Sequence, residues 1–146
     1  MTEDPRVRVL LVEDHAIVRE GVRSLLQMYR DIDVVGEVGD GEDAIVKVET
    51  LHPHVVVMDI TLPRMDGVAA TRVIKAKYPD TAVIGLSLTA KGYNAEALRR
   101  AGAYEVLSKE LACAELYSAI QQAAGSRQSA SLSSESQDPK RDSASG

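Results

Sequence analysis

Apolar and polar residues follow two different rhythms along this chain, one typical of buried strands and the other of amphipathic helices. Five short runs rich in Val, Ile and Leu are bounded by turn residues, as strands buried on both faces usually are. They fall at residues 7–12, 32–38, 55–58, 82–86 and 104–107. After each run, apolar residues recur every three or four positions, which predicts a helix. The helices are expected at residues 16–29, 41–51, 67–78, 94–101 and 111–124.

Turn and capping residues support several of these boundaries. Asp40 has an acidic residue, Asp43, three positions later, in the arrangement of a capping box. The second helix is expected to stop at His52-Pro53, because the residue before a proline disfavours helical geometry. Gly102 follows the fourth helix in the position where a glycine often ends one.

Five strands alternating with five helices predict an α/β fold, a doubly wound parallel sheet with helices on both faces and right-handed crossovers. From residue 125 onward the pattern gives way to a serine-rich stretch with few apolar residues. Such a stretch cannot bury enough surface to offset the entropy lost on ordering. We therefore predict a domain over residues 6–124 and a flexible tail or linker over residues 125–146.

The composition suits a single α/β domain. The chain has 146 residues, of which 45% are hydrophobic, enough for one core. Phe and Trp are absent, so the core must consist mainly of Val, Ile, Leu and Ala, which suit parallel strands covered by helices. The single cysteine, Cys113, lies in a helical pattern and is expected to be buried or half-buried.

The charge and the N-terminus limit the classes of function. The net charge is -5 and there is no basic run, which argues against nucleic-acid binding by this chain alone, because phosphate contacts need clustered Lys and Arg. The first residues lack the basic start and apolar core of a signal peptide, and no apolar run approaches the length of a bilayer span. We therefore expect a cytoplasmic protein with no membrane association.

Residues with reactive or charged side chains follow four of the five predicted strands. They are Glu13 and Asp14, Asp59, Ser87, and Lys109. Because parallel strands present their carboxyl ends on one edge of the sheet, we expect these side chains to gather there. Three carboxylates in one place repel one another, so a cation is expected among them. Hard oxygen ligands with room for water favour magnesium over zinc.

The same group of residues predicts phosphoryl transfer onto Asp59. A carboxylate can attack phosphorus, a metal can neutralise charge, and the Lys109 ammonium and Ser87 hydroxyl can donate to the incoming anion. Taken singly, each residue has an ordinary structural explanation, such as a loop cap for Asp59 or a surface charge for Lys109. Their joint placement at one edge favours the functional interpretation.

The segments LLVEDH, MDITLPRMDG, LS and LSK, in this order and spacing, resemble the receiver (CheY-like) domain of two-component response regulators. The resemblance covers most of the chain, from about residue 6 to 124. The opening segment VRVLLVEDHAIVREGVRSLL and Ser87 are most similar to receivers that precede LuxR/NarL-type helix-turn-helix domains. The resemblance implies a flavodoxin-like sheet with its strands, numbered along the chain, in the order 2-1-3-4-5.

The resemblance also implies a role for each site residue. Asp59 would be the phosphoacceptor that takes a phosphoryl group from a sensor histidine kinase. Ser87 would move to bond a phosphoryl oxygen, and Lys109 would pair with the phosphate. Pro63 and Gly67 would shape the loop that keeps Asp59 open to its partner.

Magnesium is the cofactor that the resemblance implies. Asp14 would bind it directly together with Asp59, and Glu13 would act largely through water. The backbone carbonyl of Thr61 would complete the protein ligands.

The family's partners and behaviour are expected to follow. The chain would be a signalling module that accepts a phosphoryl group, not a turnover enzyme. Its expected partners are a sensor histidine kinase and a second copy, bound through the helix at residues 94–101, the strand at residues 104–107 and the helix at residues 111–124.

Two positions depart from the family pattern. Three residues before the lysine, where receivers usually have Tyr or Phe, this chain has Val106, and Tyr104 lies two residues earlier on the same predicted strand face. Either Tyr104 substitutes for the usual aromatic residue, or the readout uses the backbone and the fourth helix. The proline that often follows the lysine is replaced by Glu110.

Several alternative functions also fit parts of the sequence. Within the family, the chain could be the receiver of a LuxR-type transcription factor or of a hybrid kinase. Outside it, a phosphatase of the haloacid dehalogenase type would need an acid where Thr61 stands, and a flavodoxin-like cofactor domain would need a Ser/Thr/Gly-rich loop after the first strand. His15, beside the two acids, is interpreted as a partly exposed residue at a helix start, since no nucleophile or ligand partner is spaced to use it. The basic pair Arg99 and Arg100 is interpreted as part of a solvated helix face.

Overall fold

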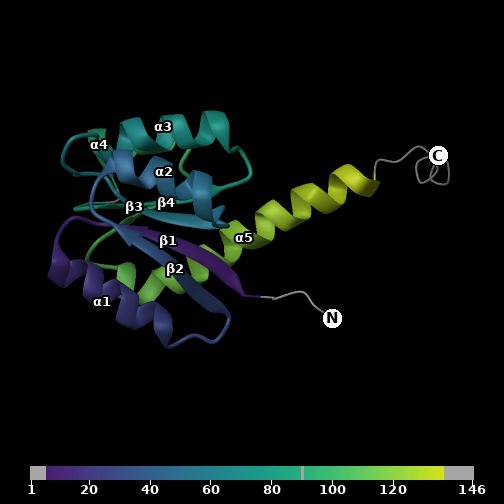
Figure 1. The fold of residues 1–146 in the computed structure, drawn as a ribbon, viewed down its shortest axis with the longest axis horizontal. Coiled ribbons are helices and arrows are strands. Elements are labelled where there is room, and N and C mark those ends of the chain that lie inside the picture. Colours follow the sequence, from purple (N-terminus) through teal and green to yellow (C-terminus); the bar gives the residue numbers. More distant parts are fainter. Residues whose placement is uncertain (1–5, 90, 137–146) are drawn as a thin grey trace.

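The computed structural model describes the backbone of residues 6–89 and 91–136 and the side chains as far as residue 125. Within this part of the chain, five strands alternate with five helices (Figure 1). The strands are β1 (Val7–Val12), β2 (Ile32–Val38), β3 (Val55–Asp59), β4 (Ala82–Ser87) and β5 (Glu105–Ser108). The helices are α1 (Ala16–Gln27), α2 (Gly41–Leu51), α3 (Gly67–Lys77), α4 (Tyr93–Arg100) and α5 (Ala112–Ser136).

The strands form one parallel sheet in the order β2-β1-β3-β4-β5. Helices α1 and α5 cover one face, and α2, α3 and α4 cover the other (Figure 1). The predicted doubly wound α/β fold and its strand order are therefore confirmed. All five strands point the same way, so their carboxyl ends share one edge.

Three clusters of buried apolar residues hold the layers together. Successive strand residues point to opposite faces, so Leu11 packs with α1 and α5 in the first core and Leu10 packs with α2 and α3 in the second. The third core lies under α4 and contains, among the residues whose side chains are described, only four buried ones, Ile60, Ala95, Leu98 and Val106. The helix α4 is thus anchored by much less apolar surface than the others.

Caps fix several helix ends at the predicted residues. The Asp40 side chain accepts a hydrogen bond of 2.8 Å from the backbone N–H of Asp43, which confirms it as the N-cap of α2. Gly102, with φ at +116°, follows α4, and the N–H of Ala103 donates to the carbonyl of Leu98 at 3.1 Å. This bond belongs to a Schellman motif, which favours glycine at the left-handed position.

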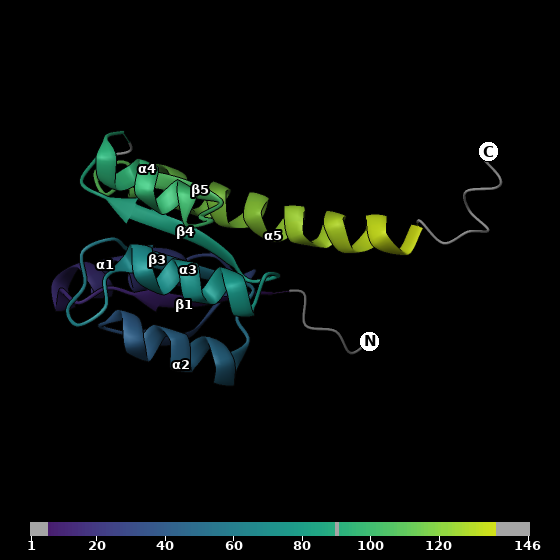
Figure 2. The same cartoon turned by 90° about the horizontal axis from the view of Figure 1, so that it is seen from above.

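The last helix is longer than predicted. The sequence predicts an end near residue 124, whereas α5 continues to Ser136 and its last turns project beyond the sheet (Figure 2). Residues 125–136 contain Gln, Arg, Ala and Ser, which a helix tolerates, and no proline. Loss of apolar periodicity therefore did not mark the end of the helix. The division into a domain and a linker stays a prediction.

The expectation that Cys113 is buried or half-buried is wrong. Cys113 is exposed, because the buried stripe of α5 passes through Leu116 and Ala119 on another side of the helix. Tyr104 lies before β5 and is 46% exposed, whereas Val106 is 3% exposed within the strand.

Although α5 is 25 residues long, no helix in the described residues is long and apolar enough to cross a membrane.

Candidate functional site

Three of the predicted site residues meet at the carboxyl edge of the sheet. Glu13 follows β1, Asp59 ends β3, and Lys109 follows β5. The Lys109 ammonium lies 3.1 Å from Asp59 Oδ1 and 3.5 Å from Glu13 Oε1. The parallel sheet thus brings together charges that are up to 96 residues apart in the sequence, from residue 13 to residue 109.

The two carboxylates are buried and only partly satisfied. Glu13 is 0% exposed and Asp59 is 1% exposed. Among the described residues, Glu13 Oε1 and Asp59 Oδ2 have no hydrogen-bond partner. A buried charged oxygen without a donor is costly, so these two atoms are the chemically unusual feature of the edge.

The electrostatics of the site show an excess of negative charge. Burial raises the pKa of Asp59, the neighbouring Glu13 carboxylate raises it further, and Lys109 opposes both effects. Burial lowers the pKa of Lys109, but the hydrogen bond and charge of Asp59, together with Glu13, outweigh this effect and leave that pKa above its ordinary value. One ammonium therefore does not balance two buried carboxylates.

Asp14 and His15 extend this group toward solvent. The backbone N–H of His15 donates to Glu13 Oε2 at 3.1 Å, and His15 Nδ1 lies 3.2 Å from that oxygen and 3.4 Å from Asp14 Oδ1. His15 is the N-cap residue of α1 and its side chain is 69% exposed, as predicted. One potential ligand atom from each of Glu13, Asp14 and His15 lies within 4.8 Å of the others, and the interpretation that His15 has no ligand role stays a prediction. In the sequence, the signal for these contacts was the position of His15 directly after Glu13 and Asp14.

The donor set fits a divalent cation. Glu13, Asp14 and Asp59 offer hard carboxylate oxygens, and the unpartnered Asp59 Oδ2 is available to a cation. The backbone N–H of Thr61 donates to Asp59 Oδ1 at 3.4 Å, which places the Thr61 main chain beside the carboxylate. These residues could hold Mg²⁺, which would supply the missing positive charge.

A glycine fixes the loop around Asp59. The N–H of Gly67 donates to the carbonyl of Ile60 at 2.9 Å. A Cβ atom at this position would collide with the carbonyl oxygen of Asp59. The start of α3 can therefore approach the end of β3 only because residue 67 has no side chain. Pro63, also predicted to shape this loop, is exposed.

Ser87 lies beside the site at the end of β4 and is 3% exposed. Its carbonyl accepts a hydrogen bond of 2.7 Å from the backbone N–H of Lys109. Ser87, Thr61 and Thr89 line a cavity of about 440 Å³, together with Ile60, the residue after Asp59. Ser87 is thus linked to Lys109 through the backbone, and it also lines an open cavity.

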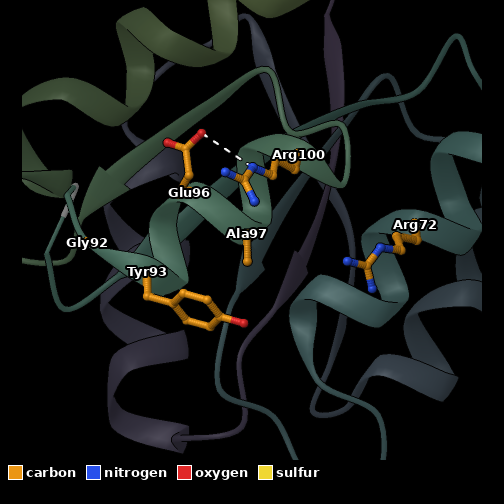
Figure 3. Close-up of a pocket in the computed structure, with 6 residues that line it drawn as sticks. All are labelled: Arg72, Gly92, Tyr93, Glu96, Ala97 and Arg100. Carbon is orange, nitrogen blue, oxygen red and sulfur yellow. Dashed lines mark ion pairs between the residues drawn. The ribbon is translucent and has the colours of Figure 1, made fainter.

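A second pocket of about 440 Å³ lies between α3 and α4. Figure 3 shows Tyr93 and Arg100 projecting from α4 and Arg72 from α3. Glu96 pairs with Arg99 at 3.7 Å and with Arg100 at 3.8 Å, and all three side chains are exposed, as predicted for a solvated face. Tyr93 is 85% exposed and lines this pocket as well as the cavity beside Ser87.

Comparisons with known proteins agree with the fold and show the family of the chain. The response regulator receiver domain family matches residues 9–121. The chain is 35% identical over 115 residues to the transcriptional regulatory protein DegU of Brevibacillus brevis, covering 79% of this chain and 49% of DegU. It is 40% identical over 114 residues to the response regulator UvrY of Escherichia coli, covering 78% of this chain and 52% of UvrY.

Solved structures give the same result. A LuxR-family two-component response regulator from Aurantimonas sp. SI85-9A1 superposes with a TM-score of 0.78 at 34% identity, covering 84% of this chain and 87% of that one. The receiver domain of NarL from Mycobacterium tuberculosis superposes with a TM-score of 0.78 at 28% identity, covering 82% and 97%. The chain spans about half the length of the curated relatives it matches.

Proposed function

Because this chain belongs to the response regulator receiver family of two-component systems, we propose that Asp59 takes a phosphoryl group from a sensor histidine kinase in the presence of Mg²⁺. The observation that carries the proposal is the buried Asp59 carboxylate, which has one oxygen paired with Lys109 at 3.1 Å and the other without a hydrogen-bond partner in the described residues. The carboxylate is thus held in place through one oxygen, and the other oxygen has no partner within the described part of the protein.

In the proposed transfer, an oxygen–phosphorus bond forms at Asp59 and the nitrogen–phosphorus bond of the phosphohistidine breaks. Asp14, Asp59 and the Thr61 carbonyl would hold Mg²⁺, with Glu13 acting largely through water, and the ion would neutralise charge on the transferred group. Lys109 already lies against Asp59 and would pair with the new phosphate. The added group carries a charge of about -1.5 to -2.

The charge of the phosphoryl group would be reported through Ser87 and α4. Ser87 would turn toward a phosphoryl oxygen, and its backbone is bonded to Lys109. Val106 stands where receivers usually have an aromatic residue, so the signal would pass either through Tyr104 or through the backbone and α4. We favour the backbone and α4, because Tyr104 is 46% exposed and precedes β5. The helix packs against β4 through Leu98, which occupies the space of a missing side chain at Gly85.

The switched surface is proposed to include the exposed face of α4 with Tyr93 and Arg100 (Figure 3). A homodimer through α4, β5 and α5 would use the same face. In this proposal the protein is cytoplasmic, has no turnover activity of its own, and does not bind nucleic acid through this chain. The family match argues against the flavodoxin-like and phosphatase alternatives.

A second candidate is a receiver unit of a LuxR-type transcription factor. It is favoured by the similarity to DegU and to a LuxR-family regulator. In this case residues 6–124 would be the receiver and residues 125–146 the linker to an output domain.

The test is phosphorylation by a small phosphodonor. Incubation with acetyl phosphate and Mg²⁺ should add one phosphoryl group, measured by intact mass. Asp59→Asn should abolish the addition because it removes the attacking carboxylate, and Asp14→Ala should lower it strongly because it removes a metal ligand. Asp80→Asn, on the exposed turn before β4, is the matched control and should react normally. Equal labelling of Asp59→Asn would refute the proposed phosphoacceptor.

A further inference from the structure

We propose that Arg19 is a positioning residue for the acidic turn formed by Glu13 and Asp14, which it holds through the main chain. This inference rests on the proposed function, in which both acids serve a Mg²⁺ ion beside Asp59. Arg19 lies near the start of α1, five residues after Asp14. It is assigned no contact with the phosphoryl group.

The guanidinium of Arg19 fixes the main chain of Glu13. Its Nη1 donates to the Glu13 carbonyl at 2.7 Å. The N–H of Glu13 donates to the carbonyl of Val38, at the end of β2, at 3.0 Å. Hydrogen bonds from a charged donor are roughly twice as strong as neutral ones. Both backbone polar groups of Glu13 are therefore bonded, and the place from which the Glu13 and Asp14 side chains extend is fixed.

Glu37 of β2 orients the Arg19 side chain. Arg19 Nε lies 3.5 Å from Glu37 Oε1, and Arg23 Nη1 donates to the two oxygens of Glu37 at 3.0 and 3.1 Å. All three side chains are half-buried, and such pairs are screened less by salt than exposed ones. Glu37 also lies between two like charges that are four residues apart on one face of α1. This row of charges directs the Arg19 guanidinium at the acidic turn.

Arg19 stabilises the turn without occupying its carboxylates. Lys109 approaches from the β5 side, with its ammonium 3.5 Å from Glu13 Oε1, so it competes with a metal ion for that oxygen. The ion pair of Arg19 is instead with Glu37, and its contact with Glu13 is to the carbonyl. The positive charge thus orders the turn while leaving the carboxylate oxygens to a metal ion.

Two effects of Arg19 on Mg²⁺ affinity have opposite signs. Its charge repels the ion, so removal of the charge alone should strengthen binding. Its hydrogen bond preorganises the turn, and Mg²⁺ demands near-octahedral ligand geometry. Loss of a partner that orients metal ligands typically lowers affinity by about 10- to 100-fold. The positioning effect should therefore exceed the repulsion, and Mg²⁺ affinity should fall when Arg19 is replaced.

The experiment compares Arg19→Met with Arg8→Met in the full chain. Methionine keeps a long unbranched side chain but removes the charge and the donors. Arg8 is the matched control, because its guanidinium also donates to a main-chain carbonyl, that of His52 at 2.9 Å, but at the opposite edge of the sheet. Calorimetric titration with MgCl₂ should show an affinity about tenfold below that of the parent for Arg19→Met. Arg8→Met should bind Mg²⁺ as the parent does.

Two further measurements separate positioning from a general loss of structure. Thermal unfolding in a chelator should show a cooperative transition for both variants. Arg19→Lys keeps the charge and a donor but lacks the Nε group that pairs with Glu37, so its Mg²⁺ affinity should lie between those of the parent and Arg19→Met. A Mg²⁺ affinity of Arg19→Met that is not below that of Arg8→Met would overturn the inference.

Phosphorylation of the same samples by acetyl phosphate, measured by intact mass, distinguishes this inference from the proposed function. Arg19→Met should need about tenfold more Mg²⁺ than the parent to reach half of its maximal labelling rate. A parent that is phosphorylated, with equal Mg²⁺ affinity in both methionine variants, would overturn only the role of Arg19. A parent that takes no phosphoryl group, with Mg²⁺ affinity lowered only in Arg19→Met, would overturn only the proposed function. A parent that binds no Mg²⁺ would overturn both.

Discussion

At the edge where the strands begin, polar side chains are paired within the protein, whereas at the edge where they end, two buried carboxylates each keep one oxygen without a hydrogen-bond partner among the described residues. At the amino edge, the N–H of Arg8 donates to His54 Nδ1 at 3.0 Å and its guanidinium donates to the carbonyl of His52 at 2.9 Å. The hydroxyl of Tyr117 donates to Asp31 at 2.7 Å. These bonds join segments that are far apart in the sequence.

At the carboxyl edge, Glu13 Oε1 and Asp59 Oδ2 have no hydrogen-bond partner among the residues described. The close approaches there are made by backbone, at glycines such as Gly67. The comparison teaches that one edge stabilises the fold, while the other gives up stability to keep charged oxygens available. Removing a polar partner at the amino edge should therefore lower stability, whereas removing the charge of an incompletely paired carboxylate at the carboxyl edge should raise it.

The largest effect is expected for Gly67→Ala. The added methyl would collide with the Asp59 carbonyl oxygen, and overpacking against backbone should cost about 3 kcal/mol of unfolding free energy. Urea denaturation measures this change. Gly21→Ala in α1, where no atom lies within 4 Å of the added Cβ, should instead stabilise by up to about 1 kcal/mol. Similar stability of both variants would refute the tight backbone contact.

The next effect is expected for Asp59→Asn, which should stabilise the metal-free protein by about 1–2 kcal/mol, the cost of an unsatisfied buried polar group. Burial and Glu13 raise the pKa of Asp59, so the folded state keeps this proton to a higher pH than the unfolded state. Wild-type stability is consequently lost as pH rises from the ordinary pKa of aspartate through the raised one.

The variant should therefore exceed the wild type above this window and match it below. Urea denaturation in a chelator between pH 4 and pH 7 tests this, and Asp80→Asn is the control at the other edge. A destabilised Asp59→Asn at neutral pH would show that the carboxylate is satisfied after all.

The smallest effect is expected for Tyr117→Phe at the amino edge. The Tyr117 hydroxyl is the main cause that lowers the pKa of Asp31, and Gln121 adds to it. A lowered carboxyl pKa contributes stability above the ordinary value, which is lost as pH falls through the folded value. The variant should be slightly less stable at neutral pH, and this deficit should disappear in acid.

Thermal unfolding as a function of pH measures the deficit. Phenylalanine keeps the ring that stacks on Tyr29 with centroids 3.7 Å apart, so a change in packing should be small. Tyr29→Phe is the matched control and should show no such pH dependence. A deficit that persists in acid would assign the effect to packing and not to Asp31.

The fold could be predicted because strands buried on both faces leave an unambiguous sequence pattern. Runs such as residues 55–58 are apolar throughout, and caps such as Asp40 act through neighbours close in sequence. The end of α5 and the exposure of Cys113 were predicted wrongly. Apolar periodicity predicts which face of a helix packs on the sheet, but it does not predict where the helix ends, and Cys113 lies outside the buried face of α5.

For the site, the sequence predicts which residues share the carboxyl edge but not how they pair. The contacts of Lys109 with Glu13 and Asp59 follow from the parallel sheet. The contact of His15 with both acids depends on the turn into α1. The collision that excludes a side chain at Gly67 depends on how closely α3 approaches β3. The roles assigned to these residues remain predictions.

The small third core has a consequence for hydrogen exchange. Local opening costs less free energy where few apolar contacts are lost. The buried cluster that holds α4 consists, in the described residues, of Ala95 and Leu98 from the helix packed with Ile60 and Val106. The amides of α4 should therefore exchange with solvent well before those of β1 and β3 in the centre of the sheet. A signal that rearranges α4 has only this small opening free energy to overcome.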